Sequence, residues 1–458
     1  MSKNMFCRKF CKLIAHFKVI YFLVFIFTFP LFFKPALPDD KFKVLFLTID
    51  SLRAENLSCY GNTRRTTPNI DKLAEEGIVF RKFYAVSGWT SPSLVSIFSS
   101  LFPTTHGVLV RGLVLNQNIK TPVEVLKENG WKTYAEHWTG DTIGNLGFEF
   151  SGNNIFDFLK KHKDETFFVW FHLRGPHLPY DPPEEYINLF LPESKINLKN
   201  VSQEKLRPIL EKKIVYKESE KIELNEDEIE YVKLLYDAEV RRQDEEVGKI
   251  INLLKELGIY DKTVVVITAD HGEELFEHGW VGHASTSRNS SLYEEILKIP
   301  LIIRVPGIKR LDVDVLSSQV DIMPTLLEIL GVKTKDFNTD GVSLVSYERK
   351  KNRVKVKDVG KRVVFAESSP CGWQCKENEK WKRVFALIED NYKIIYSNFL
   401  GDFPYDVFEL YRLPDEKENL REKEREKLSY MIQKLFEKIS ESKAKAVKIG
   451  LPERVISN

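Results

Sequence analysis

Two short apolar runs, each ending at an acidic residue, constrain the fold of this chain most strongly. Residues 43–49 (KVLFLTI) lead to Asp50, and residues 264–268 (VVVIT) lead to Asp270 and His271. Apolar, β-branched runs without polar alternation are typical of strands buried on both faces of a parallel sheet. Because ligands of open α/β sheets bind beyond the carboxyl ends of the strands, both aspartates are expected at the binding edge.

Further strands and helices alternate along the first 350 of the 458 residues. Buried strands are predicted at 167–172 and 300–305, and helices at 67–77, 91–101, 230–257 and 322–330. This alternation predicts an α/β fold with a mostly parallel central sheet that is covered by helices on both faces. The charged segment 189–228 has no clear period and is interpreted as an excursion over the surface.

The pattern changes after about residue 350. Shorter strands are predicted at 363–367, 384–388 and 393–396, and a charged helix at 421–442. We therefore expect a main domain over residues 41–350 and a smaller C-terminal α+β piece over residues 351–445.

The first forty residues differ from the rest of the chain. Basic residues at positions 3, 8, 9 and 12 precede an apolar stretch, residues 13–33, which as a helix would be about 30 Å long. The positive-inside rule then predicts a cytoplasmic segment 1–12, a single membrane anchor at 13–33 and an extracytoplasmic main domain at the cell membrane. A cleaved signal peptide is the alternative, although residues 34–38 (KPALP) offer no good cleavage site. Both interpretations export the main domain.

Charge and cysteine content narrow the partners. The net charge of +2 is spread over many residues of both signs, so nothing indicates a nucleic-acid surface. Cys7 and Cys11 fall on the predicted cytoplasmic side and would stay reduced, and Cys59 is interpreted as a buried small hydrophobe. Cys371 and Cys375 could form a small-loop disulfide in an oxidising compartment, whereas two cysteines alone make a poor zinc site.

The aspartates at the strand ends indicate a metal. Carboxylates placed just beyond buried strands are costly unless they are paired or bind a cation. A single aspartate there can also act as a helix cap, but Asp50, Asp270 and His271 together suit one divalent cation. The imidazole favours Mn²⁺ or Zn²⁺, while Ca²⁺ and Mg²⁺ stay open.

Seven motifs, in order and with matching spacing, resemble the sulfatase family of the alkaline-phosphatase superfamily. The resemblance covers about residues 41–440 and rests on the following segments: TIDSLRAENLSCYG (48–61), TTPNIDKLAEEGIVF (66–80), GWTSPSLVSIFSSLFPTTHGV (88–108), HLRGPHLPYDPP (172–183), residues 244–285, LKIPLIIRVPG (297–307) and QVDIMPTLLEILGV (319–332). It implies a metal-dependent ester hydrolase with Asp50, Thr90, Asp270 and His271 as metal ligands.

The nucleophile position departs from the family pattern. The family motif Cys-x-Pro-Ser-Arg, whose cysteine becomes formylglycine, reads Thr90-Ser91-Pro92-Ser93-Leu94 here. The family's Asp-Asp pair is Asp50-Ser51, and its Asp-Asn pair is Asp270-His271. These departures resemble the threonine-nucleophile relatives, which include phosphodiesterases, phosphomonoesterases and phosphoethanolamine or phosphoglycerol transferases.

Thr90 at that position predicts a covalent mechanism. A metal and a helix N-terminus would activate its hydroxyl for attack on phosphorus or sulfur. A phospho-threonine can be hydrolysed with metal help, whereas a sulfo-threonine lacks the second hydroxyl with which formylglycine ejects sulfate, so phosphoryl chemistry is favoured. Thr90 could instead be only an N-cap of the following helix, and both roles can coexist.

Histidines could complete the site. His177, in Pro-His-Leu-Pro-Tyr, matches the family histidine that contacts the ester or protonates the leaving group. His283, in Gly-His-Ala, falls where relatives carry a lysine or histidine directed at the transferred group. His172 and His278 are weaker candidates.

Alternatives to this function remain at the level of sequence. They are a sulfuric ester hydrolase proper, a phosphoethanolamine-type transferase and an inactive, sulfatase-like envelope protein. The replacements Leu94 and Ser51 would suit an inactive protein. The joint retention of four candidate site residues argues for catalysis; these are Asp50, Thr90, Asp270 and His271. The expected substrate is a small-molecule, lipid or glycan ester whose identity the sequence does not indicate.

Overall fold

A computed structural model describes residues 41–451, except for residues 140–143, 145, 212–221, 287–290, 334–336, 376–380 and 401–402. The membrane anchor predicted at 13–33 and its cytoplasmic flank lie outside these residues. Within the described ranges, the structure contains no helix whose length and hydropathy would let it cross a membrane. The chain from Phe42 onward forms one compact unit.

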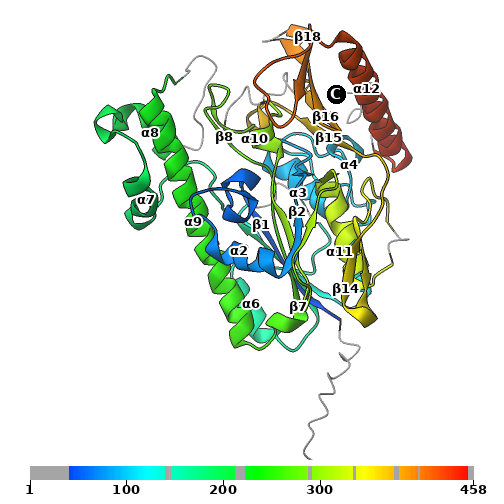
Figure 1. Cartoon of the computed structure of the whole chain (residues 1–458). Coiled ribbons are helices and arrows are strands. Elements are labelled where there is room, and N and C mark those ends of the chain that lie inside the picture. Colours follow the sequence, from blue (N-terminus) through cyan, green and yellow to red (C-terminus); the bar gives the residue numbers. More distant parts are fainter. Residues whose placement is uncertain are drawn as a thin grey trace, which may run out of the picture. The chain divides into compact units, whose positions relative to one another are not determined.

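An eight-stranded sheet forms the centre of this unit (Figure 1). Its strands, in spatial order, are β11 (Leu311–Val313), β2 (Gly77–Phe80), β10 (Leu301–Arg304), β7 (Thr263–Ala269), β1 (Lys43–Ile49), β6 (Phe167–Leu173), β4 (Lys132–Glu136) and β5 (Phe150–Ser151). Strands β7, β1, β6, β4 and β5 are mutually parallel, and β10 runs antiparallel to both of its neighbours. The predicted mostly parallel sheet is therefore confirmed.

The register of the three central strands brings their carboxyl ends to one level. Ile49 of β1 pairs with Leu173 of β6 on one side and with Ala269 of β7 on the other. All three strands are almost completely buried, as their uninterrupted apolar sequence requires. The end of β1 therefore meets the ends of β6 and β7, although each of them is more than a hundred positions from it in sequence.

Helices cover both faces of the sheet (Figure 1). One group contains α2 (Pro68–Glu75), α6 (Ile155–Lys161) and the long α9 (Glu226–Glu256), and both shorter helices contact α9. The other group contains α3 (Thr90–Ser99), α4 (Pro103–His106), α5 (Pro122–Glu128) and α11 (Ile322–Leu330). Asn225 and Glu228 form a capping box that starts α9.

The structure has two short helices that the sequence did not indicate, one at the start of the surface excursion predicted at 189–228 and one within it. Short α7 (Glu184–Phe190) packs on α9 through Phe190, which is buried against Leu234 and Ala238. A second short helix, α8 (Gln203–Glu211), contains Pro208. Two turns provide too few repeats for a clear helical period, and an internal proline argues against a helix.

The C-terminal piece is a four-stranded antiparallel sheet covered by a helix. Its strands are β15 (Val363–Ser368), β16 (Val384–Glu389), β17 (Tyr392–Leu400) and β18 (Phe403–Arg412), and α12 (Arg425–Lys448) packs on β16 and β17. The predicted α+β piece is confirmed, although β18 was not anticipated. The predicted boundary at residue 350 falls between β13 (Val345–Glu348) and β14 (Arg353–Val356), which pair as a hairpin; that boundary stays a prediction.

Candidate active site

The two predicted aspartates lie side by side beyond adjacent strands. Asp50 follows β1, Asp270 follows β7, and both side chains are fully buried. Ser51 links them, because its backbone N–H donates to Asp270 Oδ1 at 3.1 Å and its hydroxyl donates to Asp50 Oδ1 at 2.9 Å. This geometry places Ser51 in the left-handed region, with φ of 60°, and Tyr236 donates its hydroxyl to the Ser51 carbonyl at 2.5 Å. The strained turn thus orients both carboxylates.

Two imidazoles flank the carboxylates. His271 Nδ1 donates to the Gly272 carbonyl at 2.8 Å, which directs Nε2 toward Asp270 Oδ2 at 3.4 Å and Asp50 Oδ1 at 3.7 Å. His172, near the end of β6, is held through Nδ1 by Thr48 Oγ1 at 2.8 Å. Its Nε2 lies 3.5 Å from Asp50 Oδ2. Burial acts to raise the pKa of Asp50, but the charges of His177, His172 and His271 outweigh it and hold that pKa below its usual value.

These groups fit a divalent metal. Asp50 Oδ2, Asp270 Oδ2 and His172 Nε2 are buried without a hydrogen-bond partner among the described residues. Asp50, Asp270 and His172 each offer an atom within 4.8 Å of the others. Buried carboxylates left unpaired cost several kcal/mol, roughly, and a cation with mixed oxygen and nitrogen ligands removes that cost. The structure therefore adds His172 to the ligands expected from sequence.

Two glycines allow the loops to pass close to the centre. A Cβ on Gly175, where φ is 66°, would lie 1.9 Å from the Asp50 carbonyl oxygen. A Cβ on Gly272, which follows His271, would lie 1.9 Å from the Glu295 carbonyl oxygen. Any side chain at either position would push the backbone that carries a candidate ligand out of place.

Thr90 is the first residue of α3 and reaches the same centre. Its Oγ1 lies 3.3 Å from His271 Nε2. The N-cap residue of the helix is Trp89, whose side chain makes no capping hydrogen bond. The helix N-terminus opens into a cavity of about 300 Å³. This cavity is lined by Trp89, Thr90, Ser91, Arg111, Trp138, Thr139, His177, His283, Ser285 and Thr286.

His177 and His283, both predicted site residues, line this cavity together. Their ring centroids lie 4.8 Å apart, and the His283 ring lies 4.2 Å from that of His271. His177 Nδ1 donates to the Leu178 carbonyl at 2.5 Å, which leaves Nε2 as its other polar atom. Burial lowers the pKa of His177 although Asp50 opposes the shift, so the neutral imidazole is favoured.

Glu273, which the sequence reasoning missed, completes the site through His283. Its Oε1 lies 2.7 Å from His283 Nδ1. Burial raises the pKa of Glu273 to about 8, and burial together with the charge of His271 lowers the pKa of His283 to about 3. Both shifts favour a protonated carboxyl that donates to Nδ1, so that His283 Nε2 carries a proton. Its position two residues after His271 is the sequence feature that could have identified Glu273 as a candidate site residue.

Trp138 is a second residue that the sequence reasoning missed. It is 45% exposed, its ring stacks on His172 with centroids 5.8 Å apart, and it meets His177 edge-on at 5.9 Å. The side chain thus covers one imidazole of the centre and offers an exposed apolar face to the cavity.

His278 lies outside the catalytic cavity. It stacks on Tyr293 at 3.7 Å and lies 3.4 Å from Glu274 Oε2, in a separate cavity between the β8 (Glu274–Leu275) and β9 (Val281–Gly282) hairpin and the C-terminal sheet. The position of His278 therefore does not support a part for this residue in the active site.

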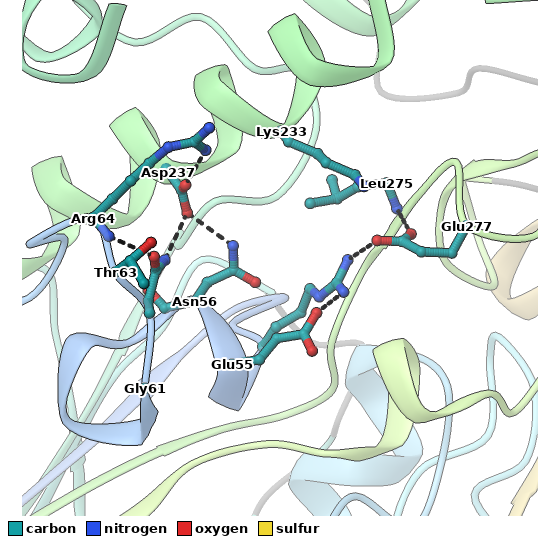
Figure 2. Close-up of a pocket in the computed structure, with 11 residues that line it drawn as sticks. Glu55, Asn56, Gly61, Thr63, Arg64, Lys233, Asp237, Leu275 and Glu277 are labelled. Carbon is teal, nitrogen blue, oxygen red and sulfur yellow. Dashed lines mark hydrogen bonds and ion pairs between the residues drawn. The ribbon is translucent and has the colours of Figure 1, made fainter. Parts of the chain in front are cut away.

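A further cavity beside the site contains paired charges (Figure 2). Arg53 pairs with Glu55 and Glu277, and Arg64 pairs with Asp237 at 2.7 Å. Arg53 also donates to the Glu273 carbonyl at 3.2 Å. Through this bond the network holds the backbone of Glu273, whose carboxyl contacts His283 in the catalytic cavity.

A metal-dependent ester hydrolase is the class of enzyme that such a fold and centre define. The family model "Sulfatase" matches residues 43–155 and 149–332, and the model "N-sulphoglucosamine sulphohydrolase, C-terminal" matches residues 277–445. The chain belongs to the sulfatase family, whose members are metal-dependent hydrolases. The suspected family is thereby confirmed.

Relatives and solved structures agree with this assignment. Arylsulfatase K of Bos taurus is 27% identical over 90% of this chain and 84% of its own length. The N-acetylglucosamine-6-O-sulfatase of Bacteroides thetaiotaomicron is 24% identical over 66% of this chain and 70% of its own length.

Two structures share the fold. BT4656 in complex with its substrate D-glucosamine-2-N,6-O-disulfate has a TM-score of 0.68 at 20% identity and covers 88% of this chain and 99% of that chain. The phosphonate monoester hydrolase of Agrobacterium radiobacter has a TM-score of 0.67 at 18% identity and covers 88% of this chain and 96% of that chain.

Proposed function

We propose that this sulfatase-family hydrolase cleaves phosphate esters outside the cytoplasm through a covalent intermediate on Thr90. The observation that carries the proposal is the position of the Thr90 hydroxyl, at the uncapped N-terminus of α3 and 3.3 Å from His271 Nε2. A helix N-terminus offers backbone N–H groups to a phosphoryl oxygen.

Asp50, Asp270, His172 and His271 would hold the metal, with Thr90 and substrate oxygen available to complete its coordination. When bound, a divalent cation supplies positive charge that neutralises phosphoryl oxygens and lowers the pKa of a nearby hydroxyl. The orphaned atoms of Asp50, Asp270 and His172 are the structural support for this assignment.

In the first step, Thr90 Oγ forms a bond to phosphorus while the bond from phosphorus to the leaving oxygen breaks. We assign the hydroxyl proton to Nε2 of His177, because Nδ1 is committed to the Leu178 carbonyl. The lowered pKa of His177 makes its protonated form a better proton donor than an ordinary imidazolium, and this form returns the proton to the leaving alcohol.

His283 has a different part in this proposal. Its Nε2–H, fixed by the Glu273 carboxyl, donates a hydrogen bond to an oxygen of the transferred group. In the second step water attacks the phospho-threonine, the bond to Thr90 Oγ breaks, and the oxygen of Thr90 recovers a proton from the attacking water.

Sulfuric ester hydrolysis is the second candidate, and the sulfatase names of the curated relatives favour it. By analogy with those relatives, a glycan or other small-molecule ester is the proposed type of substrate. The threonine supports phosphoryl chemistry instead, because a threonine ester of sulfate has no neighbouring hydroxyl to expel the sulfate.

A turnover panel tests the proposal. Purified protein would be assayed with Mn²⁺ or Zn²⁺ on a phosphate monoester, a phosphate diester, a phosphonate ester and an aryl sulfate. Thr90→Ala should lower kcat by at least about a thousandfold, or roughly 4 kcal/mol of transition-state stabilisation. Thr90→Ser should keep part of the activity because the hydroxyl survives. Wild-type turnover by Thr90→Ala, or a preference for aryl sulfate by orders of magnitude, would overturn the mechanism.

A further inference from the structure

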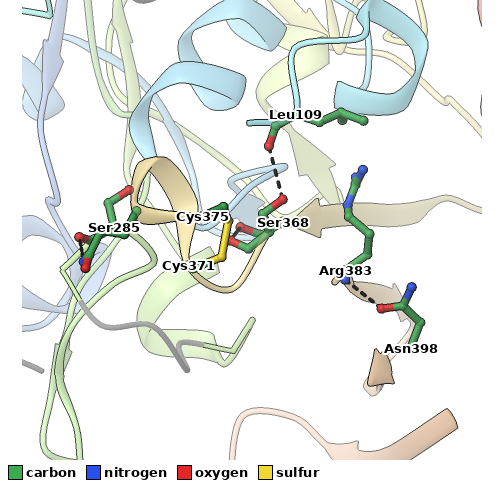
Figure 3. The surroundings of a disulfide bond; sticks show 9 residues. Leu109, Ser285, Ser368, Cys371, Cys375, Arg383 and Asn398 are labelled. Atoms are coloured by element: carbon green, nitrogen blue, oxygen red, sulfur yellow. Dashed lines mark hydrogen bonds between the residues drawn. A yellow bond between two sulfur atoms is a disulfide. The ribbon is translucent and has the colours of Figure 1, made fainter. Parts of the chain in front are cut away.

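A small disulfide loop lies against the catalytic cavity. After β15, Cys371 and Cys375 are bonded and enclose the short turn Gly372–Gln374 (Figure 3). The sequence spacing left open whether these two cysteines form a disulfide, and in the structure they do. The loop belongs to the C-terminal piece, whereas the metal centre lies at the end of the large sheet.

The loop holds one segment of the cavity wall. Gln374 Nε2 donates to the carbonyl of Ser285, which lines the cavity. Gly372 approaches so closely that an added Cβ would lie 2.2 Å from Ser285 Oγ and 2.7 Å from Ser285 N. Ser285 itself has a left-handed backbone, with φ of 92°, so its conformation depends on such contacts.

The residues just before the loop hold a second segment. The hydroxyl of buried Ser369 donates to the Leu109 carbonyl at 3.3 Å. Leu109 lies two residues before Arg111, which also lines the cavity. Gly372 N–H in turn donates to the Ser369 carbonyl at 3.0 Å, so the loop and Ser369 form one hydrogen-bonded unit.

His283, two residues before Ser285, is held by contacts that do not involve the disulfide loop. His283 is held by Glu273 at 2.7 Å, and its backbone N–H donates to Thr286 Oγ1 at 2.8 Å. Loosening the loop would therefore displace the wall formed by Ser285, while the His283 ring keeps its contact with Glu273 and the metal ligands keep theirs.

We infer that the loop closed by Cys371 and Cys375 is a positioning element of the catalytic cavity, which fixes Ser285 and the segment leading to Arg111 for substrate binding. The kinetic part of this inference rests on the proposed ester hydrolysis. The structural part concerns the order of the cavity wall and can be measured without any turnover.

The test compares wild type with Cys371→Ser/Cys375→Ser and with Gln374→Ala, both in the full chain. We expect KM for the best ester of the panel to rise about tenfold in the double variant, with kcat changing less than about threefold. Amide hydrogen exchange in the peptide covering residues 281–286 should become faster, and metal stoichiometry should stay that of wild type. Gln374→Ala should shift KM and exchange in the same direction.

Two controls separate this effect from a general loss of a cysteine. Cys59→Ser removes the free thiol of η2 (Ser58–Tyr60), away from the loop, and should match wild type. Dithiothreitol, which reduces the bond to two thiols and becomes a cyclic disulfide, should reproduce the variant's exchange pattern in wild type and add nothing to the double variant.

Unchanged KM and unchanged exchange in both the double variant and the reduced wild type would overturn the inference. Loss of metal together with kcat would also overturn it, because the loop would then support the centre itself. If wild type cleaves none of the esters, the proposed function fails, and the exchange of residues 281–286 still decides whether the loop orders the cavity wall.

Discussion

Ser51 orients the two candidate metal ligands on either side of it through hydrogen bonds. It stands where the family resemblance expects a second aspartate, and it donates hydrogen bonds to both Asp50 and Asp270. Its left-handed backbone is costly for any residue with a Cβ and is free for glycine.

A matched pair of substitutions measures that cost. Ser51→Gly and Ser51→Ala both lose the hydroxyl, but only Ser51→Gly relieves the backbone strain. We expect the free energy of unfolding to be about 1 kcal/mol higher for Ser51→Gly than for Ser51→Ala. Equal urea midpoints with equal slopes would show that the left-handed turn stores no strain.

The metal ligands can be separated by metal content. Asp270→Ala and His172→Ala should each lower the stoichiometry of bound Mn²⁺ or Zn²⁺ and the activity together, because each removes a buried atom without another partner. Circular dichroism should stay near that of wild type. His278→Ala, in the separate cavity, is the control and should keep full metal content. Full occupancy in His172→Ala would return the ligand set to the one expected from sequence.

Sequence alone predicted most of the candidate site and missed what depends on three-dimensional contacts. Asp50, Thr90, Asp270 and His271 were identified by strand ends and motifs, and the structure brings them together. His172 was only a weak candidate because its motif position carried no signal, whereas its place beside Asp50 follows from the pairing of β6 with β1.

Among the helices, α2 depends on a residue from another helix. Asp244 of α9 accepts from the backbone N–H groups of Asn69 and Ile70, at 3.0 and 2.8 Å, in the first turn of α2. Asp244→Ala leaves these donors without their acceptor and should lower the free energy of unfolding by about 2 kcal/mol in urea titration. Glu246→Ala, which removes an exposed ion pair with Lys249 on the same helix, should cost much less.

The same carboxylate predicts a pH dependence. Burial raises the pKa of Asp244 to about 6, above its value of 3.8 in an unfolded chain, although hydrogen bonds from Ile70 and Asn69 oppose the shift. The folded state therefore takes up a proton in this window while the unfolded state stays ionised, so this group contributes more stability as the pH falls. The free energy of unfolding of wild type minus that of Asp244→Asn should therefore increase as the pH falls from about 7.5 to about 4.5. A difference that shrinks over this range would contradict the assignment.

Elements with uninterrupted apolar sequence were predicted best. The strand expected at 43–49 has those bounds, β6 is one residue longer than expected at its carboxyl end, and β7 is one residue longer at each end. In contrast, β18 was missed because its first half is exposed and mixes proline, charge and aromatic residues. Short helix α7 was missed because its stability comes from packing on α9 rather than from a local pattern, and α8 was missed because Pro208 lies inside it.

For the whole molecule, we propose a single-pass membrane protein with an extracytoplasmic catalytic domain, based on the basic and apolar N-terminal sequence. The Cys371–Cys375 bond is compatible with an oxidising compartment. Protease added to intact cells or spheroplasts should digest the domain and spare the first twelve residues. Full protection of the domain in intact cells, with digestion after lysis, would refute this topology.

The pairing of β1 with both β6 and β7 also sets the order of events during synthesis. The candidate ligands Asp50, His172 and Asp270 come from strands separated by more than two hundred residues from first to last. A nascent chain therefore cannot complete the metal centre until β7 has left the ribosome and inserted beside β1. Metal uptake by ribosome-bound chains of increasing length would thus mark the moment at which the central strands come together.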